Sequence, residues 1–278
     1  MKAIGFKKHL KIDDPESLID FEMKKPTAKG HDLLVKVNAV SVNPVDIGVR
    51  KGGHSVLKTP KAIGWDACGV VEEVGSKVSL FKPGDRVFYA GSFIRSGSDS
   101  EYQLVDERIV GHAPETLKDN EAAAMPLTSL TAYEALFEQM DLTWNQENNQ
   151  HKTILIINGA GGVGSVATQL AHLAGLTVIA TASRPDSIKW TQDHGADYVV
   201  NHREDLVKQV RKLGFKYVDY ILELKDLDGH WKEMCELVKP EGHIVSITEN
   251  HRPINLRLLT KKKAHFSWEW MYTKSYYQ

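Results

Sequence analysis

The sequence predicts an α/β protein with two domains, a small β-rich domain followed by a doubly wound parallel sheet. Three observations lead to this prediction. Short strand-like segments separated by turn signals fill the first part of the chain, and strands alternate strictly with helices from Thr153 onward. The length of 278 residues suits two domains, and a hydrophobic fraction of 42% is enough to build their cores.

The first part is expected to form a small barrel or sandwich. A turn signal at Lys82–Asp85 separates two of its strands. The strands are expected over residues 32–42, 68–75, 86–90 and 101–105. Alanine and leucine at helical spacing then predict a helical segment over 119–140, with a break at Pro126, and a polar connector follows over 144–152.

The second part is expected to form a parallel sheet with helices on both faces, because each of its strands is followed by a helical pattern. The intervening helices are expected to end near Leu173, His194, Leu213 and Val238. The strands are expected over residues 153–157, 177–181, 198–200, 217–222 and 243–247.

Composition limits the kind of partner and the compartment. The 35 Lys and Arg balance 36 Asp and Glu to a net charge of −1, which argues against a nucleic-acid-binding protein. With 2 cysteines, Cys68 and Cys235, the chain has neither a disulfide scaffold nor a four-cysteine zinc site. No apolar run approaches the ~20 residues of a membrane span. We therefore predict a cytoplasmic protein with no membrane or nucleic-acid partner.

A glycine-rich loop predicts a dinucleotide site. Gly159, Gly161 and Gly164 satisfy the G-x-G-x-x-G pattern, directly after an aliphatic strand and at the start of an alanine-rich helix. Such a loop lets the backbone approach a pyrophosphate at the helix N-terminus. The alternative is a glycine turn in a nucleotide-free domain. The predicted contacts of this loop are Gly159, Ala160, Gly161, Gly162, Val163 and Gly164.

The end of the next strand favours NADP(H) over NAD(H). Sites for NAD place a carboxylate there to bind the ribose 2′-hydroxyl, but this chain has Ser183 and Arg184, with Lys189 one turn into the following helix. These side chains suit a 2′-phosphate, although the two cations could also be ordinary surface residues. His202 is also predicted to contact the cofactor.

Over its whole length the chain resembles the medium-chain dehydrogenase/reductases. Within them it is most similar to the quinone oxidoreductase (zeta-crystallin-like) branch, which includes "zinc-type alcohol dehydrogenase-like" members. The resemblance implies a GroES-like catalytic domain over 1–125, incomplete without a C-terminal return, a Rossmann domain over 126–266, and the start of a truncated return segment over 267–278. It rests on the glycine loop and on the segments Ser41–Asp46 with Arg50, Gly64–Gly75, Lys82–Val87 and Pro126–Tyr133.

The chain departs from the zinc-dependent relatives at the positions of their metal ligands. Those relatives carry a Cys where this chain has Asn43, and a His-Glu pair where it has Trp65-Asp66. They carry another Cys near the position of Leu127. Of these residues, Asp66 alone has a side chain that zinc prefers. We therefore predict no zinc, and we expect Cys68 to be a small buried residue.

The resemblance also implies a set of catalytic residues. Asn43 and Asp46 would lie in the catalytic cleft, where the Asn43 amide would donate to a substrate oxygen. Arg50 would orient Asp46 or receive an anionic group, and Thr131 would contact the nicotinamide end of the cofactor. His54 is a candidate proton donor. Four of these residues have a structural alternative. Asn43-Pro is a turn signal, Asp46 could cap a short helix, His54 could be a loop histidine, and Thr131 could be buried in a helix.

Together these features predict an NADPH-dependent, zinc-independent oxidoreductase that transfers hydride to a quinone or an α,β-unsaturated carbonyl. The alternatives are a zinc-dependent alcohol dehydrogenase and a non-catalytic, crystallin-like NADPH-binding protein. The resemblance further implies a homodimer, with the strand-like segment 264–268 pairing across its interface.

Overall fold

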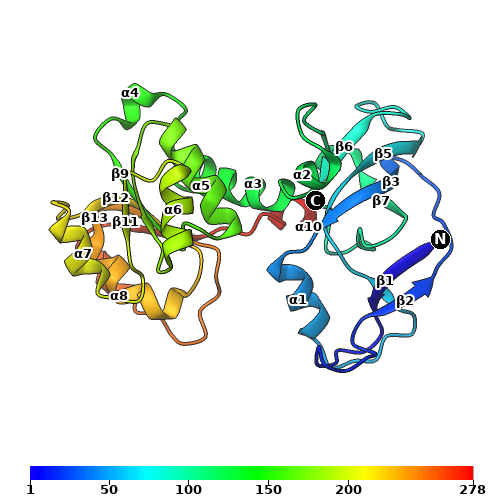
Figure 1. Ribbon diagram of the computed structural model, residues 1–278, viewed down its shortest axis with the longest axis horizontal. Helices are drawn as coiled ribbons and strands as arrows, with labels where there is room; N and C mark the ends of the chain where they lie inside the picture. The colour runs from blue at the N-terminus through cyan, green and yellow to red at the C-terminus, as the bar shows by residue number, and fades with distance from the viewer. Residues whose placement is uncertain (278) are drawn as a thin grey trace. The chain divides into compact units, whose positions relative to one another are not determined.

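The computed structural model describes residues 1–277. It divides into two compact units, Met1–Leu127 together with the residues from Tyr272 onward, and Thr128–Met271. In Figure 1 the first unit carries the blue and cyan elements, and the second carries most of the green, yellow and orange ones. The segment from Tyr272 belongs to the first unit and contains the short helix α10 (Thr273–Tyr276).

The first unit is built on two antiparallel sheets, one of five strands in the order β7-β3-β5-β6-β8 and one of three in the order β2-β1-β4. Besides α10, its helices are α1 (Pro44–Lys51), the 3₁₀ turn η1 (Glu107–Ile109) and α2 (Asp119–Ala123). The strands are β1 (Lys2–Phe6), β2 (Ile19–Glu22), β3 (Asp32–Ser41), β4 (Lys61–Ala62), β5 (Asp66–Val74), β6 (Arg86–Tyr89), β7 (Tyr102–Asp106) and β8 (Gly111–His112).

The larger core cluster of the first unit lies on one face of the five-stranded sheet, and a smaller cluster joins Cys68 of β5 to α2. Alternate side chains point to the same face of a strand, so Leu33 and Val35 of β3 pack with Val87 and Tyr89 of β6. Val105 of β7 joins the same cluster. This alternation explains why the predicted strands near 32, 68, 86 and 101 are found in the structure.

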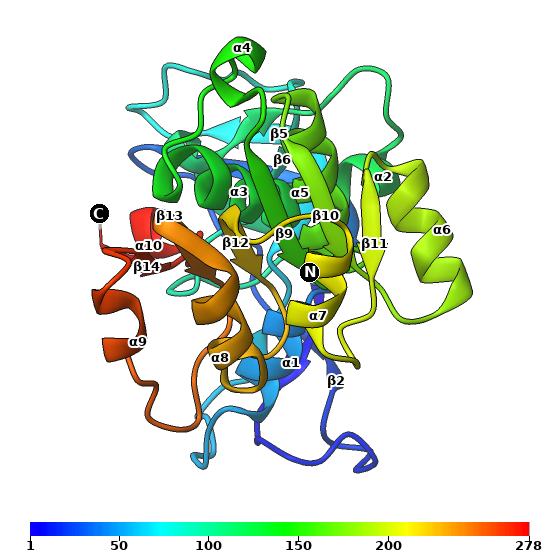
Figure 2. The same cartoon turned by 90° about the vertical axis from the view of Figure 1, so that its left-hand side faces the viewer.

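The second unit contains the predicted parallel sheet, which is confirmed. Its six strands have the order β11-β10-β9-β12-β13-β14, and each pairs in parallel with its neighbours. Figure 2 shows the strands beside one another. They are β9 (Thr153–Ile157), β10 (Thr177–Thr181), β11 (Tyr198–Val200), β12 (Val218–Glu223), β13 (Val238–Ser246) and β14 (His265–Trp268).

Helices cover both faces of this sheet. The first helical segment consists of α3 (Pro126–Tyr133), which starts at the predicted Pro126 break, and the π-helical turn η2 (Glu134–Gln139). The others are α4 (Gln146–Asn149), α5 (Gly162–Leu173), α6 (Pro185–Asp193), α7 (Leu206–Lys212), α8 (Leu227–Leu237) and α9 (Arg257–Thr260).

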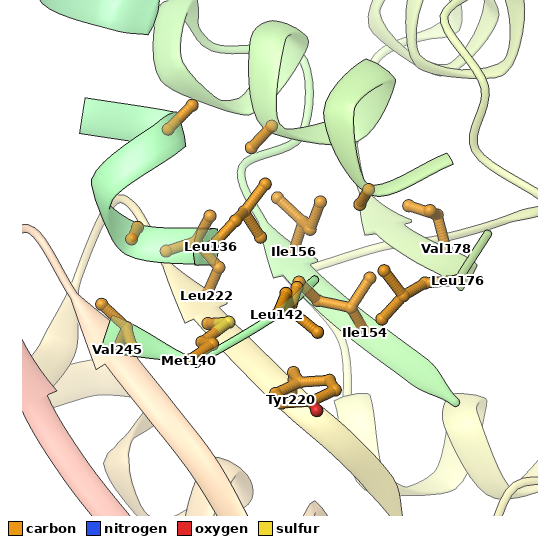
Figure 3. Packing of buried hydrophobic residues seen from close by; sticks show 14 of the residues in the cluster. Leu136, Met140, Leu142, Ile154, Ile156, Leu176, Val178, Tyr220, Leu222 and Val245 are labelled. Atoms are coloured by element: carbon orange, nitrogen blue, oxygen red, sulfur yellow. The ribbon is translucent and has the colours of Figure 1, made fainter. Parts of the chain in front are cut away.

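Successive residues of the central strand β9 serve two different cores. Ile154 and Ile156 pack with η2 and α5 on one face, as Figure 3 shows for Ile154, Ile156 and Leu136. Leu155 and Ile157 pack with α7 and α8 on the other face. All five residues of β9 are buried, as expected for a parallel strand covered on both faces.

The parallel arrangement brings the carboxyl ends of all six strands to one edge of the sheet. The chain runs outward in the two directions from the pair β9 and β12, so this pair marks the topological switch point, where ligands of such sheets bind. Within residues 1–277, no helix is long and apolar enough to cross a membrane.

Candidate functional site

The glycine loop joins β9 to α5 at the switch point. Asn158 adopts a left-handed conformation with φ of 72°, and its N–H donates to Thr181 Oγ1 at 2.8 Å. Gly161 is the N-cap residue of α5. At Gly164 an added Cβ would lie 2.2 Å from the Asn158 carbonyl oxygen, so the helix can approach the loop only with glycine here. The loop therefore leaves the N-terminus of a long helix open to an anion.

A pocket of about 320 Å³ lies beside this loop, at the carboxyl ends of β9, β10, β11 and β12. Its lining combines backbone from the loop with hydroxyl groups and positively charged side chains. The lining residues are Asn158, Ala160, Gly161, Thr181, Ala182, Ser183, Arg184, Ser187, His202, Arg203 and Lys225.

Three cations of this pocket lack acidic partners. Arg184 is the N-cap residue of α6, Arg203 follows β11, and Lys225 follows β12. None of the three forms an ion pair with any described carboxylate, whereas Lys189 and Lys239 of the same unit do so. Neighbouring positive charges repel one another when no acidic group lies among them. The three cations therefore favour the binding of an anionic ligand such as a phosphate.

The structure brings some of the predicted cofactor residues to this pocket and not others. Ala160, Gly161, Ser183, Arg184 and His202 line it. Gly159, Gly162 and Gly164 form the loop and the first turn of α5.

The three glycines just named do not line the pocket, and neither do three other predicted cofactor residues. Val163 packs on the hydrophobic core, and Thr131 is buried in α3. Lys189 is exposed and forms a salt bridge with Asp193, one turn further along α6, at 2.7 Å. Its position matches the surface alternative considered from the sequence.

Two lining cations, Arg203 and Lys225, were not predicted from the sequence. Arg203 stands beside the predicted His202, and Lys225 follows the strand that ends at Glu223. The signal that could have found them is their position just past the carboxyl end of a parallel strand, where ligand-binding side chains gather.

Buried Glu223 fixes the loop that carries Lys225. The Glu223 carboxylate accepts the backbone N–H groups of Lys225 and Asp226 and the hydroxyls of Ser246 and Thr248. These hydrogen bonds connect the pocket beside the glycine loop to the end of β13. A second pocket, of about 590 Å³, lies there and is lined by Ile247, Thr248, Glu249, Asn250, Trp268, Glu269 and Trp270.

In the first unit, Asn43, Asp46 and Asp66 form a buried polar cluster. Asn43 Nδ2 donates to Asp66 Oδ2 at 2.8 Å, and the Leu127 N–H donates to Asp66 Oδ1 at 2.8 Å. The Asn43 backbone N–H donates to Asp46 Oδ2 at 2.7 Å, so Asp46 stabilises the start of α1. Asp46 thus makes the helix-capping contact that was its structural alternative, and Asp66 holds the Asn43 amide in one orientation.

The carboxyl groups of this cluster, and that of Asp99, on which the charge of Asp46 acts, have raised pKa values. Burial raises the pKa of Asp66 from 3.8 to about 7, with a smaller contribution from the negative charge of Asp46. Burial also raises the pKa of Asp99, to about 6, and raises that of Asp46. Asp66 can therefore hold or release a proton near neutral pH, which is the range a general acid or base requires.

The remaining predicted catalytic residues are placed differently. Arg50 is buried, and its guanidinium donates to the Leu10 carbonyl at 2.7 Å. Within the described part of the chain it forms no hydrogen bond or ion pair with Asp46, so its position favours a structural role. His54 lies in an exposed loop after α1. Cys68 is fully buried, as expected, with Sγ 3.5 Å from an oxygen of Asp119.

The residues at the family's zinc positions do not fit the metal. Asn43, Trp65 and Leu127 offer no thiolate, imidazole or carboxylate, and both oxygens of Asp66 already accept N–H groups. Over the described part of the chain, no group of three or more His, Cys, Asp or Glu side chains is arranged to hold a metal ion.

Two family models match the sequence. The alcohol dehydrogenase GroES-like domain covers residues 29–115, and the zinc-binding dehydrogenase model covers 162–278. The chain is 47% identical over 274 residues to a zinc-type alcohol dehydrogenase-like protein of Staphylococcus epidermidis, covering 99% of this chain and 81% of the relative. The chain therefore belongs to the medium-chain dehydrogenase/reductase superfamily, a family of oxidoreductases.

Solved structures and a further relative resemble the chain over most of its length. A Rhizobium etli protein, provisionally described as a zinc-dependent alcohol dehydrogenase, has a TM-score of 0.93 and 44% identity, covering 100% of this chain and 80% of that chain. The Escherichia coli quinone oxidoreductase, solved with NADPH, has a TM-score of 0.84 and 27% identity, covering 98% of this chain and 81% of that chain. Human quinone oxidoreductase is 36% identical over 72% of this chain and 59% of the relative.

Proposed function

We propose that the chain is an NADPH-dependent, zinc-independent oxidoreductase that transfers hydride to a quinone or an α,β-unsaturated carbonyl. The observation that carries this proposal is the pocket beside the glycine loop, where Arg184, Arg203 and Lys225 lack acidic partners. The Escherichia coli relative solved with NADPH supports the same cofactor.

The pocket fits the phosphate-rich part of NADPH. The N-terminus of α5 would receive the pyrophosphate, and the three cations with the Ser183 hydroxyl would hold the 2′-phosphate. The second pocket, at the ends of β13 and β14, lies along the same edge of the sheet and has room for the other half of a dinucleotide. Bound NADPH supplies a hydride to an electrophilic carbon.

The cluster in the first unit supports the proposed substrate class. Without a Lewis acid, an alcohol lacks a means of losing its hydroxyl proton, so an electrophilic enone or quinone is the more suitable substrate. Negative charge then develops on the substrate oxygen. Asn43 is held by Asp66 and would donate its second amide hydrogen to that oxygen in place of the long contact of 3.5 Å with the Ser41 carbonyl. Asp66 would hold a proton near neutral pH.

A fluorescence titration tests the cofactor assignment. NADPH should bind more tightly than NADH. Arg184→Ala should lower the ratio of NADPH affinity to NADH affinity by about tenfold, which is the effect of losing one charge-assisted contact. Equal affinities in the unmodified protein would contradict the assignment. A panel of quinones and enones tests the reaction, and the absence of NADPH oxidation with every member would favour the non-catalytic alternative.

The homodimer and the cytoplasmic location predicted from the sequence belong to the same proposal. β14 is an edge strand of the six-stranded sheet, so its outer side is available for pairing with a second copy. Light scattering should give twice the chain mass of 31.1 kDa, and a monomer at micromolar concentration would contradict this part of the proposal.

A further inference from the structure

His202 connects the glycine loop to a cation of the pocket. Its Nδ1 lies 3.1 Å from Thr181 Oγ1, and its Nε2 lies 3.1 Å from Lys225 Nζ. Thr181 Oγ1 in turn accepts the N–H of Asn158, the residue that precedes the glycines. The imidazole therefore stands between β10 and the loop after β12, and both of its nitrogens have partners.

These contacts define the protonation state of His202. The Lys225 ammonium can only donate, so Nε2 must accept and carries no proton. In the neutral ring the single proton then sits on Nδ1 and is donated to Thr181 Oγ1. A doubly protonated ring would place an N–H group against the ammonium, so the contact with Lys225 requires neutral His202.

The charged surroundings keep the ring neutral. Burial lowers the pKa of His202, and the positive charges of Lys225, His230 of α8 and neighbouring Arg203 lower it further. Arg184 of α6 lines the same pocket. His230 faces a carboxylate of its own helix, Glu233, at 3.1 Å. No described carboxylate pairs with His202, and the charges that shift its pKa belong to Lys225, Arg203 and the titratable His230.

We propose that His202 and Lys225 form a proton-linked clamp for the 2′-phosphate of NADP(H). Neutral His202 holds the Lys225 ammonium at the pocket by accepting its hydrogen bond. When the phosphate enters, Lys225 turns to it and vacates Nε2, which takes up one proton from solvent. The imidazolium then faces a dianion, whose charge favours the protonated ring. This inference rests on the proposed use of NADPH, and it makes His202 a determinant of cofactor preference and of its pH dependence.

Calorimetry can measure the proton directly. NADPH and NADH would each be titrated into the protein at pH 7.5 in two buffers of different ionisation enthalpy. At this pH the 2′-phosphate is almost fully dianionic, since its second pKa is about 6, so the ligand itself exchanges few protons. The variants are His202→Gln, which keeps a polar side chain that cannot titrate, and Lys225→Met. The matched control is His151→Gln, an exposed histidine next to the amino end of β9.

In the unmodified protein and in His151→Gln, the binding of NADPH should be accompanied by the uptake of more protons than the binding of NADH. The difference should lie between a few tenths of a proton and one proton. His202→Gln should remove this difference. Between pH 8.5 and 7.0 the affinity for NADPH should rise by about three- to thirtyfold in the unmodified protein and by less than about twofold in His202→Gln. Lys225→Met should weaken NADPH binding by about tenfold and leave NADH binding unchanged.

Two results would overturn the inference, and they can be told apart. If NADPH is preferred over NADH but proton uptake is the same in the unmodified protein and His202→Gln, the clamp is wrong and the proposed cofactor stands. If NADPH binds no more tightly than NADH to the unmodified protein, the cofactor assignment fails and the clamp fails with it.

Discussion

The buried carboxyl group of Asp66 should make the stability of the protein depend on pH in the opposite direction to that of most carboxylates. Its folded pKa of about 7 lies above the usual 3.8. The folded state therefore binds the proton more tightly than the unfolded state. The stabilising contribution is fully present below about pH 4, falls as the pH rises through the folded pKa, and is gone above it.

The size of this effect follows from the shift. Between the two pKa values each pH unit removes about 1.4 kcal/mol, so from pH 5 to pH 8 the protein should lose about 2–3 kcal/mol through Asp66. Asp66→Asn removes the titration. The variant loses one hydrogen bond, because the amide NH₂ of the new Asn side chain must face either Asn43 Nδ2 or the Leu127 N–H, and both of these are donors. We expect this loss to lower the free energy of unfolding by about 1–3 kcal/mol at every pH.

Urea unfolding of the unmodified protein and of Asp66→Asn at pH 5 and pH 8 measures both quantities. Fluorescence can report the first unit, since Trp65 is buried beside Asp66 in the chain. The variant should be clearly less stable at pH 5 and should approach or exceed the unmodified protein at pH 8. Asp13→Asn, at an exposed position, serves as the control. If the two stabilities differ by the same amount at both pH values, the reasoning about buried Asp66 is refuted.

Three further predictions concern the second unit. Gly164→Ala should abolish measurable cofactor binding because its Cβ would meet the Asn158 carbonyl at 2.2 Å, and a circular dichroism spectrum close to that of the unmodified protein would show that the fold survives. Leu155→Ala, in the centre of β9, should cost about 2–5 kcal/mol in chemical denaturation, and a cost below about 1 kcal/mol would contradict its place in the core. Lys189→Ala should change the ratio of NADPH to NADH affinity by less than about twofold, because this lysine pairs with Asp193. A tenfold loss of this ratio would instead indicate that Lys189 contacts the 2′-phosphate.

The sheet of the second unit was predictable because its signals are local. Aliphatic strands, a glycine loop and helical periodicity identify β9, β10 and β11 within a residue of their observed limits. The first unit was less predictable. β1 and β2 are short and partly exposed, and their pairing depends on residues far apart in the chain, so the sequence contains no local pattern for them.

The site divides in the same way. The glycine loop, Ser183 and Arg184 follow from a motif and its spacing. Arg203 and Lys225 reach the same pocket from other strands, and their participation depends on the strand order, which brings the ends of β11 and β12 to one edge. The abnormal titration of Asp66 depends on burial, which no spacing reveals.

The central claim is that this oxidoreductase reduces an electrophilic substrate with NADPH and without zinc. The most direct measurement is NADPH oxidation with a quinone and an enone, on protein treated with a chelator and analysed for metal content. We predict that turnover persists when zinc is far below one atom per chain and that added zinc does not increase it. Loss of turnover together with zinc, and its recovery on adding stoichiometric zinc, would contradict the claim and favour a zinc-dependent alcohol dehydrogenase.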